Sequence, residues 1–402
     1  MSNGIILKKN NVLNVIKTIK NYGPITKLDV ADKTKMTAVS IHNFISELIA
    51  KEILIEYGSA ESNGGRKPVL YKLNPSFGYV IGQCLTLTGI KTALFDFSME
   101  KKVAREVSFE NLSVTEVINL MTEQIKNMMA DYGSEYKQCL GIGITVPGQV
   151  NPESGTINNL TNMPMWNKVS LKTMVEQEVK LPVFVENDNK ATILGIKWME
   201  EISENSCIVY VAISSGVGSG ILYNGELFNG KHFSAGEIGH ISVQYDGEMC
   251  NCGNKGCLEL MISDKAIAAR IKQELEKSES TDRIKPWLTA DWNMEKVIRL
   301  GEEGHPIVMD VLKDICNYII ICIDNIVKVY DPEEIIFECS WLQAFPELLE
   351  AAAEQFFKRT HWTDRKQVRI KLNKTKDVFE IGAATLVIED LFKLSANNKL
   401  LL

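Results

Sequence analysis

Three cysteines and a histidine lie close together between residues 240 and 257. Cys250, Cys252 and Cys257 have the spacing Cys-x-Cys-x4-Cys, and His240 precedes the first of them by ten residues. Three thiolates and one imidazole form a tetrahedral ligand set typical of structural Zn²⁺. The alternative is a disulfide with one spare thiol, but disulfides are rare in the reducing compartment that we expect for this chain. The spacing therefore predicts a zinc loop at 240–257.

Composition and charge limit the class of protein. The chain has 402 residues, 45% hydrophobic and 24% charged, which is typical of a soluble globular protein of two or three domains. No apolar run approaches the roughly 18 residues of a membrane helix, and no signal peptide is recognisable at the start. We therefore expect a cytoplasmic protein with no membrane partner.

Charge is distributed unevenly along the chain. The formal net charge is −7, yet residues 1–75 contain eleven Lys and Arg against six Asp and Glu. A basic head on an acidic body indicates a polyanion-binding domain attached to a second function.

The basic head has the pattern of a winged helix-turn-helix. Apolar residues recur at helical spacing over 11–22, and Thr26 can cap a second short helix that ends near residue 32. Thr37 can cap a third helix, and strand-like runs at 53–57 and 69–73 flank a basic, glycine-containing tip. We expect the third helix to bury Val39, Ile41, Phe44, Ile45, Leu48 and Ile49.

This pattern predicts a DNA-binding domain over 1–75. In the major groove, the third helix would present Thr37, Ala38, Ser40, His42 and Asn43 to bases and phosphates. Asn43 suits adenine, and Arg66 on the wing suits a narrow A·T-rich minor groove. Lys67, the second residue of the basic pair on the wing, is also a candidate DNA contact. One winged helix contacts few base pairs, so we expect a homodimer or homotetramer on a palindromic, A·T-rich operator. The alternative is a protein-docking module whose charges form a solvated face.

The body alternates strands and helices. Strand-like runs occupy parts of 79–96, 140–146, 183–185, 208–213 and 334–337, and helical patterns cover 114–132, 190–200 and 306–329. This order predicts an α/β fold with ligands at the glycine-rich strand ends.

Several ordered motifs of the body resemble the ROK (repressor, open reading frame, kinase) family. They are the glycine run 216–220, the segment from Gly236 to His240, the cysteine cluster, and Glu186-Asn187-Asp188. With a winged helix ahead of it, the chain is similar to the repressor branch, of the xylose-repressor and N-acetylglucosamine-repressor type. The resemblance implies a two-lobed actin-like (ribonuclease H-like) ATPase/sugar-kinase fold over 76–402, serving sugar binding and oligomerisation.

The resemblance also implies a monosaccharide site between the lobes. The matching positions are Asn187, Asp188, Glu237, His240 and Glu259, with Asn162 and Gly148 as weaker candidates. His240 would bond a sugar hydroxyl through one ring nitrogen and ligate zinc through the other. Simpler alternatives remain: helix caps for Asn187 and Asp188, solvated carboxylates for Glu237 and Glu259, and a turn for Asn162.

Asp188 matches the general base of sugar kinases, but two nucleotide-binding turns of such kinases are missing. The first hairpin has Gln83-Cys84-Leu85-Thr86-Leu87 in place of Asp-x-Gly-Gly-Thr, and a late strand runs into Glu338-Cys339-Ser340 in place of three glycines. We therefore assign no catalytic residue and predict a non-enzymatic, sugar-responsive repressor of carbohydrate-utilisation genes. An ATP-dependent sugar kinase and a regulator controlled by a phosphotransferase-system protein are the alternatives.

Overall fold

The chain folds into two compact units. Unit 1 comprises Met1–Glu201 and Asp377–Leu402, and unit 2 comprises Ile202–Lys376. The computed structural model describes residues 3–61, 67–160, 163–200, 202, 205–277, 292–359 and 367–392.

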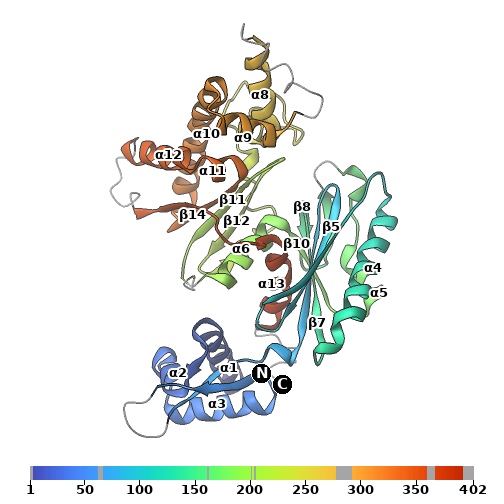
Figure 1. Ribbon diagram of the computed structural model, residues 1–402, viewed down its shortest axis with the longest axis vertical. Coiled ribbons are helices and arrows are strands. Elements are labelled where there is room, and N and C mark those ends of the chain that lie inside the picture. The colour runs from blue at the N-terminus through green and yellow to red at the C-terminus, as the bar shows by residue number, and fades with distance from the viewer. Residues whose placement is uncertain are drawn as a thin grey trace. The chain divides into compact units, whose positions relative to one another are not determined.

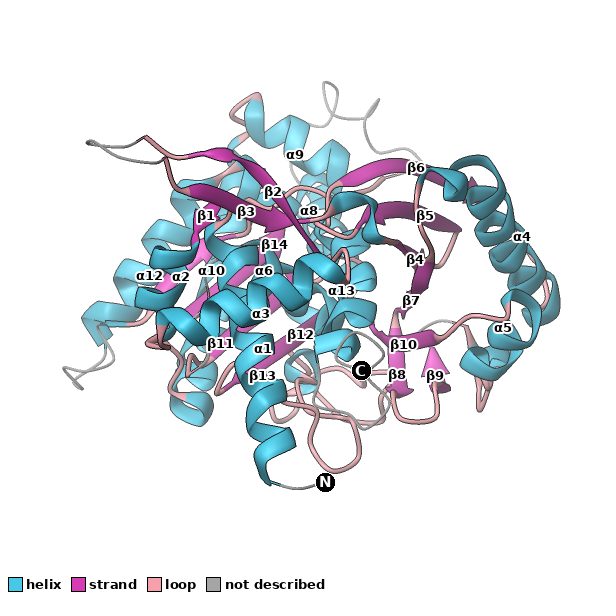
Figure 2. Ribbon diagram, turned by 90° about the horizontal axis from the view of Figure 1, so that it is seen from below, coloured by secondary structure: helices cyan, strands magenta, loops and turns pink. Residues whose placement is uncertain are grey.

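The N-terminal part of unit 1 is a winged helix-turn-helix (Figures 1 and 2). Its helices are α1 (Asn3–Tyr22), α2 (Lys27–Thr34) and α3 (Ala38–Ala50). Its sheet has the order β1 (Ile25–Thr26), β3 (Val69–Leu73), β2 (Leu54–Ser59). The expected helices and wing strands are confirmed, although α1 begins eight residues earlier than its apolar spacing indicated.

Side-chain caps define the starts of α2 and α3. The Thr26 hydroxyl accepts from the backbone N–H of Asp29 at 3.2 Å, and Thr37 does the same for Ser40 at 3.2 Å. Lys35 ends α2 with φ 56°, the left-handed conformation that lets the chain reverse. The two threonines therefore have the capping roles that the sequence predicted.

One expectation for α3 is wrong. Ile41 and Ile45 are fully buried, but Val39 is 72% exposed. At 100° per residue, a side chain two positions before Ile41 points to nearly the opposite face of the helix. Val39 therefore lies on the solvent face together with His42 and Asn43.

The body of unit 1 is a mixed sheet between helices. Its strands, in sheet order, are β10 (Val183–Asn187), β7 (Cys139–Val146), β4 (Tyr79–Leu85), β5 (Gly89–Asp96) and β6 (Lys101–Ser108). Figure 1 shows α4 (Val114–Tyr132) and α5 (Leu171–Val179) on one side, with α13 (Val378–Phe392) on the other. A Cβ atom at Gly143 would lie 1.7 Å from the Ala383 carbonyl oxygen, so α13 packs directly on the strands.

Two further elements of unit 1 carry candidate site residues. The helix α6 (Asp188–Met199) follows β10 and packs against α13. The ribbon of β8 (Gly148–Asn151) and β9 (Thr156–Leu160) follows β7.

Unit 2 repeats the same architecture. Its strands, in sheet order, are β13 (Glu226–Leu227), β12 (Val217–Tyr223), β11 (Ile208–Ile213), β14 (Glu334–Cys339) and β15 (Arg369–Leu372). Its helices are α7 (Glu259–Ile262), α8 (Asp264–Lys277), α9 (Met294–Glu302), α10 (Pro306–Tyr330), α11 (Ser340–Ala344) and α12 (Pro346–Arg359).

The two sheets have one topology. Counted along the chain within each five-stranded sheet, both have the strand order 3-2-1-4-5, with strands 1 to 3 antiparallel and strands 4 and 5 parallel to strand 1. A ribonuclease H-like sheet present twice is the actin-like fold that the motifs implied, so this prediction is confirmed.

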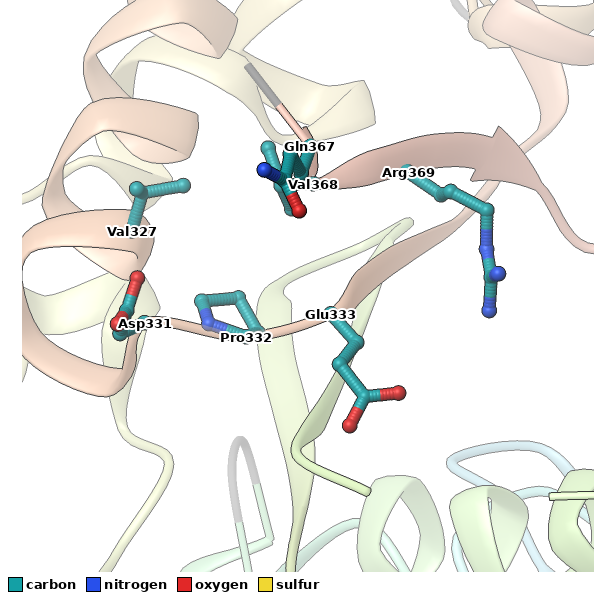
Figure 3. A pocket seen from close by; sticks show the side chains of 7 residues that line it. All are labelled: Val327, Asp331, Pro332, Glu333, Gln367, Val368 and Arg369. Carbon is teal, nitrogen blue, oxygen red and sulfur yellow. The ribbon is translucent and has the colours of Figure 1, made fainter. Parts of the chain in front are cut away.

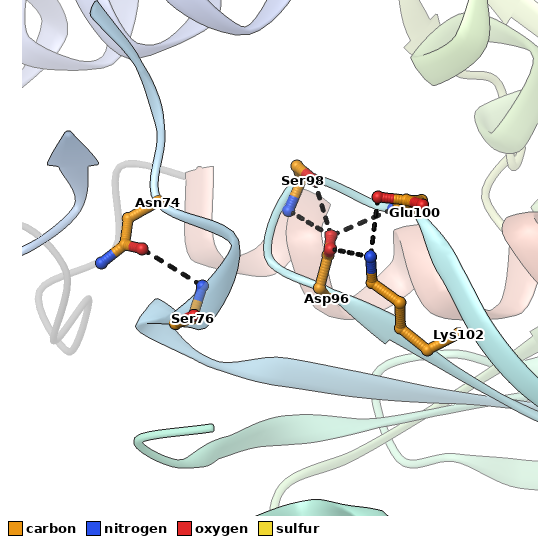
Figure 4. A network of polar contacts seen from close by, with 6 residues as sticks. All are labelled: Asn74, Ser76, Asp96, Ser98, Glu100 and Lys102. Atoms are coloured by element: carbon orange, nitrogen blue, oxygen red, sulfur yellow. Dashed lines mark hydrogen bonds and ion pairs between the residues drawn. The ribbon is translucent and has the colours of Figure 1, made fainter. Parts of the chain in front are cut away.

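Short-range hydrogen bonds fix the segment that leads from the wing into β4 (Figure 4). Asn74 caps a short 3₁₀ turn by accepting from Ser76, and its amide donates to the Glu52 carbonyl at 2.8 Å. In the following hairpin, the fully buried Asp96 accepts from Ser98 and pairs with Lys102 at 2.9 Å. The head is thus joined to the lobe by a structured segment.

Among the helices of the described ranges, none has the length and apolar character needed to cross a membrane.

Candidate functional site

The cysteine cluster forms a compact set of donor atoms. The ligand atoms of His240, Cys250, Cys252 and Cys257 all lie within 4.8 Å of one another. Nδ1 of His240 is 3.6 Å from Sγ of Cys250, and Sγ of Cys252 is 3.6 Å from Sγ of Cys257. With bonds of ~2.3 Å, a tetrahedral Zn–thiolate site has sulfur–sulfur edges of about 3.8 Å, so the spacing fits an ion of this size. The nine cysteines are all free thiols.

Glycines and backbone hydrogen bonds close the cysteine loop. Gly256 has φ 61°, and a Cβ atom there would lie 1.7 Å from the Gln244 carbonyl oxygen. Gly253 has φ 88° and donates to the Cys250 carbonyl at 2.9 Å. The amide of Asn254 donates to the His240 carbonyl at 3.1 Å. Hydrogen bonds and glycine conformations within the loop therefore bring its three cysteines together.

The surroundings of the thiols shift their pKa values in different directions. A hydrogen bond from the Asn254 backbone lowers the pKa of Cys252, whereas burial raises the pKa of Cys257 to about 12. A bound cation would stabilise all three thiolates and remove this difference.

Three candidate sugar residues of unit 2 gather around the start of β12. Glu259 accepts from the backbone N–H of Val217 at 2.9 Å, and Glu237 precedes the short turn Ile238–His240. That turn packs on β12, because a Cβ atom at Gly239 would lie 2.1 Å from the Val217 carbonyl oxygen. Glu237 is exposed and His240 is half-buried, so both are accessible to a ligand.

The candidates of unit 1 meet at the N-terminus of α6. Asn187 caps this helix by accepting from the Lys190 N–H at 3.1 Å, and its amide donates to the Gly148 carbonyl at 3.1 Å. Asp188 is the first helical residue and accepts from the N–H of Asn189 at 2.8 Å. Asn187 is thus a helix cap, which was the simpler alternative for this residue. The cap fixes the start of α6 and with it the backbone of Asp188. Asn162 lies outside the described residues.

Two buried charges beside Asn187 were not singled out from the sequence. Glu186 is 3% exposed and Lys190 is 5% exposed. Glu186 also accepts from the N–H of Asn187 at 2.7 Å. A Glu-x-x-x-Lys spacing across the strand–helix boundary is the signal that could have indicated them.

The predicted DNA-contacting residues of α3 fall into two groups. The side chains of Thr37 and Ser40 lie 2.9 Å apart and serve the cap, while Ala38, His42 and Asn43 are exposed. On the wing, Lys67 is exposed, and Arg66 lies outside the described residues.

Contacts between α2 and α3 fix the orientation of His42. The ammonium of Lys27 lies 3.1 Å from Nδ1 of His42 and 5.3 Å from the ring centre of Tyr71 on β3. Lys27 donates and Nδ1 accepts, so a neutral His42 carries its remaining N–H on Nε2. That N–H can donate to an acceptor in a groove.

In each of the two segments that correspond to nucleotide-binding turns of sugar kinases, a polar side chain makes internal hydrogen bonds. Gln83 is fully buried and donates to Thr92 at 2.9 Å and to the Met121 carbonyl at 3.1 Å. In unit 2, Glu338 accepts from Gln343 at 2.9 Å. Both segments are committed to internal contacts.

A separate shallow pocket of about 240 Å³ lies in unit 2 beyond the end of α10 (Figure 3). Val327, Asp331, Pro332, Glu333, Gln367, Val368 and Arg369 line it. It is smaller than the ~300 Å³ typical of ligand sites, and none of the candidate residues borders it.

Comparisons with known proteins agree with the fold and the motifs. The ROK family model matches residues 84–390. The xylose repressor of Caldicellulosiruptor bescii is 31% identical over 97% of this chain and 98% of its own.

Two solved structures share the fold. A ROK family transcriptional regulator, a homologue of the Escherichia coli MLC protein, has a TM-score of 0.82 at 23% identity, covering 96% of this chain and 97% of its own. A ROK family glucokinase from Streptomyces griseus, in complex with glucose and AMPPNP, has a TM-score of 0.66 at 22% identity. It matches 78% of this chain and 100% of its own. From the family match and the full-length similarity to the xylose repressor, the chain belongs to the ROK family.

Proposed function

We propose that this chain is a sugar-responsive transcriptional repressor of carbohydrate-utilisation genes. The observation that carries the proposal is a winged helix-turn-helix on the same chain as a ROK body. Residues 1–75 would bind operator DNA, and residues 76–402 would bind the sugar and form the oligomer. Such a protein works in the cytoplasm, where its operator is.

The candidate sugar-binding residues form two sets, one at the start of α6 and one at the start of β12. Asn187 and Asp188 in the first set, and Glu237, His240 and Glu259 in the second, are the residues that would hydrogen-bond a monosaccharide. Carboxylates, an amide and an imidazole can each accept from or donate to sugar hydroxyls. The similarity to a xylose repressor makes D-xylose the first sugar to test.

Zinc would aim His240 at the sugar. Nδ1 is the ring nitrogen on the side of the cysteines, so a metal bound there leaves Nε2 for a hydroxyl. A metal ligand cannot rotate freely, so the ion fixes both the ring plane and the tautomer. The ion would have no other chemical role.

On DNA, α3 would enter the major groove with Ala38, His42 and Asn43, and Lys67 would approach the backbone beside the wing. Two heads of a homodimer or homotetramer would occupy the half-sites of a palindromic, A·T-rich operator. Sugar binding need favour one conformation of the protein by only a few kcal/mol to release the DNA.

The competing function is an ATP-dependent sugar kinase, favoured by Asp188 at the position of a general base. Catalysis also requires the phosphates and Mg²⁺ to be held in line with the acceptor. Buried Gln83 stands where these kinases have an aspartate. The segments 85–86 and 338–340 carry side chains where these kinases have glycines. The repressor is therefore the better account of these residues.

A gel-shift assay tests the proposal. The purified chain is mixed at low salt with the DNA upstream of its own gene, and Asn43→Ala serves as a matched variant of the DNA surface. We expect a specific shift that Asn43→Ala weakens, with no sugar-dependent ATP consumption. A wild-type chain that leaves this DNA unshifted, or that consumes ATP with D-xylose, contradicts the proposal.

A further inference from the structure

One helix of unit 1 connects the candidate sugar residues to the DNA-binding head. Asn187 and Asp188 lie at the N-terminus of α6, and Trp198 lies in its last turn. At 1.5 Å per residue, the ten steps between Asp188 and Trp198 span about 15 Å. A shift of either end is therefore transmitted along one rigid element.

The helix α6 is held tightly against α13. A Cβ atom at Gly195 would lie 2.8 Å from the backbone nitrogen of Gly382, and one at Gly382 would lie 2.6 Å from the Ala191 carbonyl oxygen. At the end of the helix, the ring of Trp198 stacks on Phe392 with centroids 5.8 Å apart and planes 9° apart. The two helices must move together, because no side chain separates them at the glycines.

The C-terminal end of α6 is bound by the head. The ammonium of Lys20, in the last turn of α1, donates to the Trp198 carbonyl and lies 4.2 Å from the centre of its ring. The last carbonyls of a helix lack partners within the helix, and the negative end of its dipole attracts a cation. Lys20 thus makes both a hydrogen bond to the Trp198 carbonyl and a cation–π contact with the Trp198 ring.

The same contact lies in a continuous apolar cluster. Ile16 and Ile19 of α1 belong to one buried cluster with Trp198, Ile381 and Phe392 of the lobe. The head is consequently packed on α6 and α13 and does not hang from a free linker.

We propose that Lys20 and Trp198 are positioning residues that transmit sugar occupancy from the N-terminus of α6 to the winged helix. This inference rests on the proposed function. A sugar bound at Asp188 shifts α6, the Lys20–Trp198 contact carries the shift into α1, and the head changes its presentation to DNA. Neither residue is among the candidate sugar-binding or DNA-binding residues.

The test measures the coupling between the two ligands in the full-length, metal-loaded protein. For each variant, the DNA dissociation constant is measured with and without D-xylose, and D-xylose affinity is measured separately without DNA. Lys20→Met removes the cation, Lys20→Arg keeps it, and Trp198→Leu removes the ring. Lys137→Gln is the matched control, because Lys137 forms another head–lobe ion pair, with Glu52 at 2.6 Å, away from α6.

In the wild type, we expect the DNA dissociation constants with and without D-xylose to differ by a factor of at least ~5. In Lys20→Met and Trp198→Leu, this factor should fall to about 2 or less. Lys20→Arg and Lys137→Gln should retain the wild-type factor, and D-xylose affinity should be unchanged throughout. Full coupling in Lys20→Met, or equal loss in Lys137→Gln, overturns the inference while the proposed function stands. A wild type whose DNA affinity ignores the sugar overturns both.

Discussion

A carboxylate oxygen of Glu259 accepts a hydrogen bond from the backbone N–H of Val217 at 2.9 Å, which ties the start of α7 to the start of β12. A Cβ atom at residue 216 would lie 2.8 Å from the same oxygen, so Gly216 is the residue that permits the contact. Glu259 is therefore a fixed group beside the turn that carries His240, rather than a mobile surface carboxylate.

Glu259→Gln should weaken sugar binding about tenfold, because a charge-assisted hydrogen bond to a hydroxyl is worth roughly 1.5 kcal/mol. The glutamine oxygen can still accept from Val217, so the fold should be retained. Titration calorimetry with D-xylose measures the loss. Glu226→Gln, at an exposed carboxylate of the same unit, is the control, and equal affinity of both variants for the sugar would refute the assigned role of Glu259.

Cys252→Ser should reduce bound zinc from about one ion per chain to nearly none, because a tetrahedral site loses one of four ligands. Sugar affinity should fall at least ~10-fold through the released His240, while DNA binding without sugar changes little. Metal analysis and calorimetry measure these effects, with Cys207→Ser as the control outside the cluster. Equal loss of sugar and DNA binding would mean that the ion holds the whole fold.

Asn187→Ala should destabilise the protein by about 1 kcal/mol, because it removes the N-cap of α6. Ser113→Ala removes the capping box of α4 and should have a similar cost. Only the first change should weaken sugar binding. Denaturant unfolding and calorimetry compare the two variants, and a Ser113→Ala protein with equally weakened sugar binding would count against a specific role for Asn187.

Asp264→Asn should stabilise the protein at neutral pH. Burial raises the pKa of Asp264 to about 6, and its Oδ1 atom has no hydrogen-bond partner. Because the folded-state pKa lies above the unfolded value of ~3.9, ionisation opposes folding, and stability is lost as pH rises from about 4 through 6.

The expected gain from Asp264→Asn is about 1–2 kcal/mol at pH 7.5, reduced from the full effect by partial exposure, and close to zero at pH 4. Thermal unfolding at the two pH values measures it. Asp310→Asn at an exposed position should be neutral at both. A gain that is the same at pH 4 and 7.5 would show that ionisation of Asp264 is not its cause.

Val39→Ala should remove one element of DNA discrimination. The exposed isopropyl group of Val39 lies on the side of α3 that we propose to face DNA, where it can contact the methyl group of a thymine. In a duplex enriched from a random pool by the wild type, replacing that thymine by uracil should weaken wild-type binding about fourfold, at ~0.8 kcal/mol per methyl.

Val39→Ala should bind the thymine and uracil duplexes equally, while Val329→Ala, which removes an exposed valine of unit 2, should discriminate like the wild type. If replacing thymine by uracil changes the DNA affinity of the wild type and of Val39→Ala to the same extent at every position, the valine does not contact a thymine methyl.

Local signals in the sequence were sufficient for much of the fold. Thr26 and Thr37 cap the helices expected of them, and α4 has the bounds that its apolar spacing predicted. Helix caps and apolar periodicity depend on residues only a few positions apart, so they can be predicted from one sequence. Val39 was misjudged because it was counted as an apolar residue without regard to the helical period, which puts it on nearly the opposite face from Ile41.

The site was only partly predictable. The spacing of the cysteines and His240 identified a cluster whose atoms meet within 4.8 Å, because its loop is short. The contact of Lys20 with Trp198 joins residues 178 positions apart, and no local pattern encodes it. The bond from Val217 to Glu259 depends in the same way on how β12 and α7 pack.

The most direct test of the account is the DNA affinity of the full-length protein as a function of sugar. Fluorescence anisotropy of a labelled operator duplex is recorded while D-xylose, D-glucose or N-acetylglucosamine is added to the wild type. The account predicts that one sugar weakens DNA binding at least ~5-fold, and that Asp188→Asn abolishes the response without weakening sugar-free DNA binding. DNA affinity that is constant with all three sugars at millimolar concentration contradicts it.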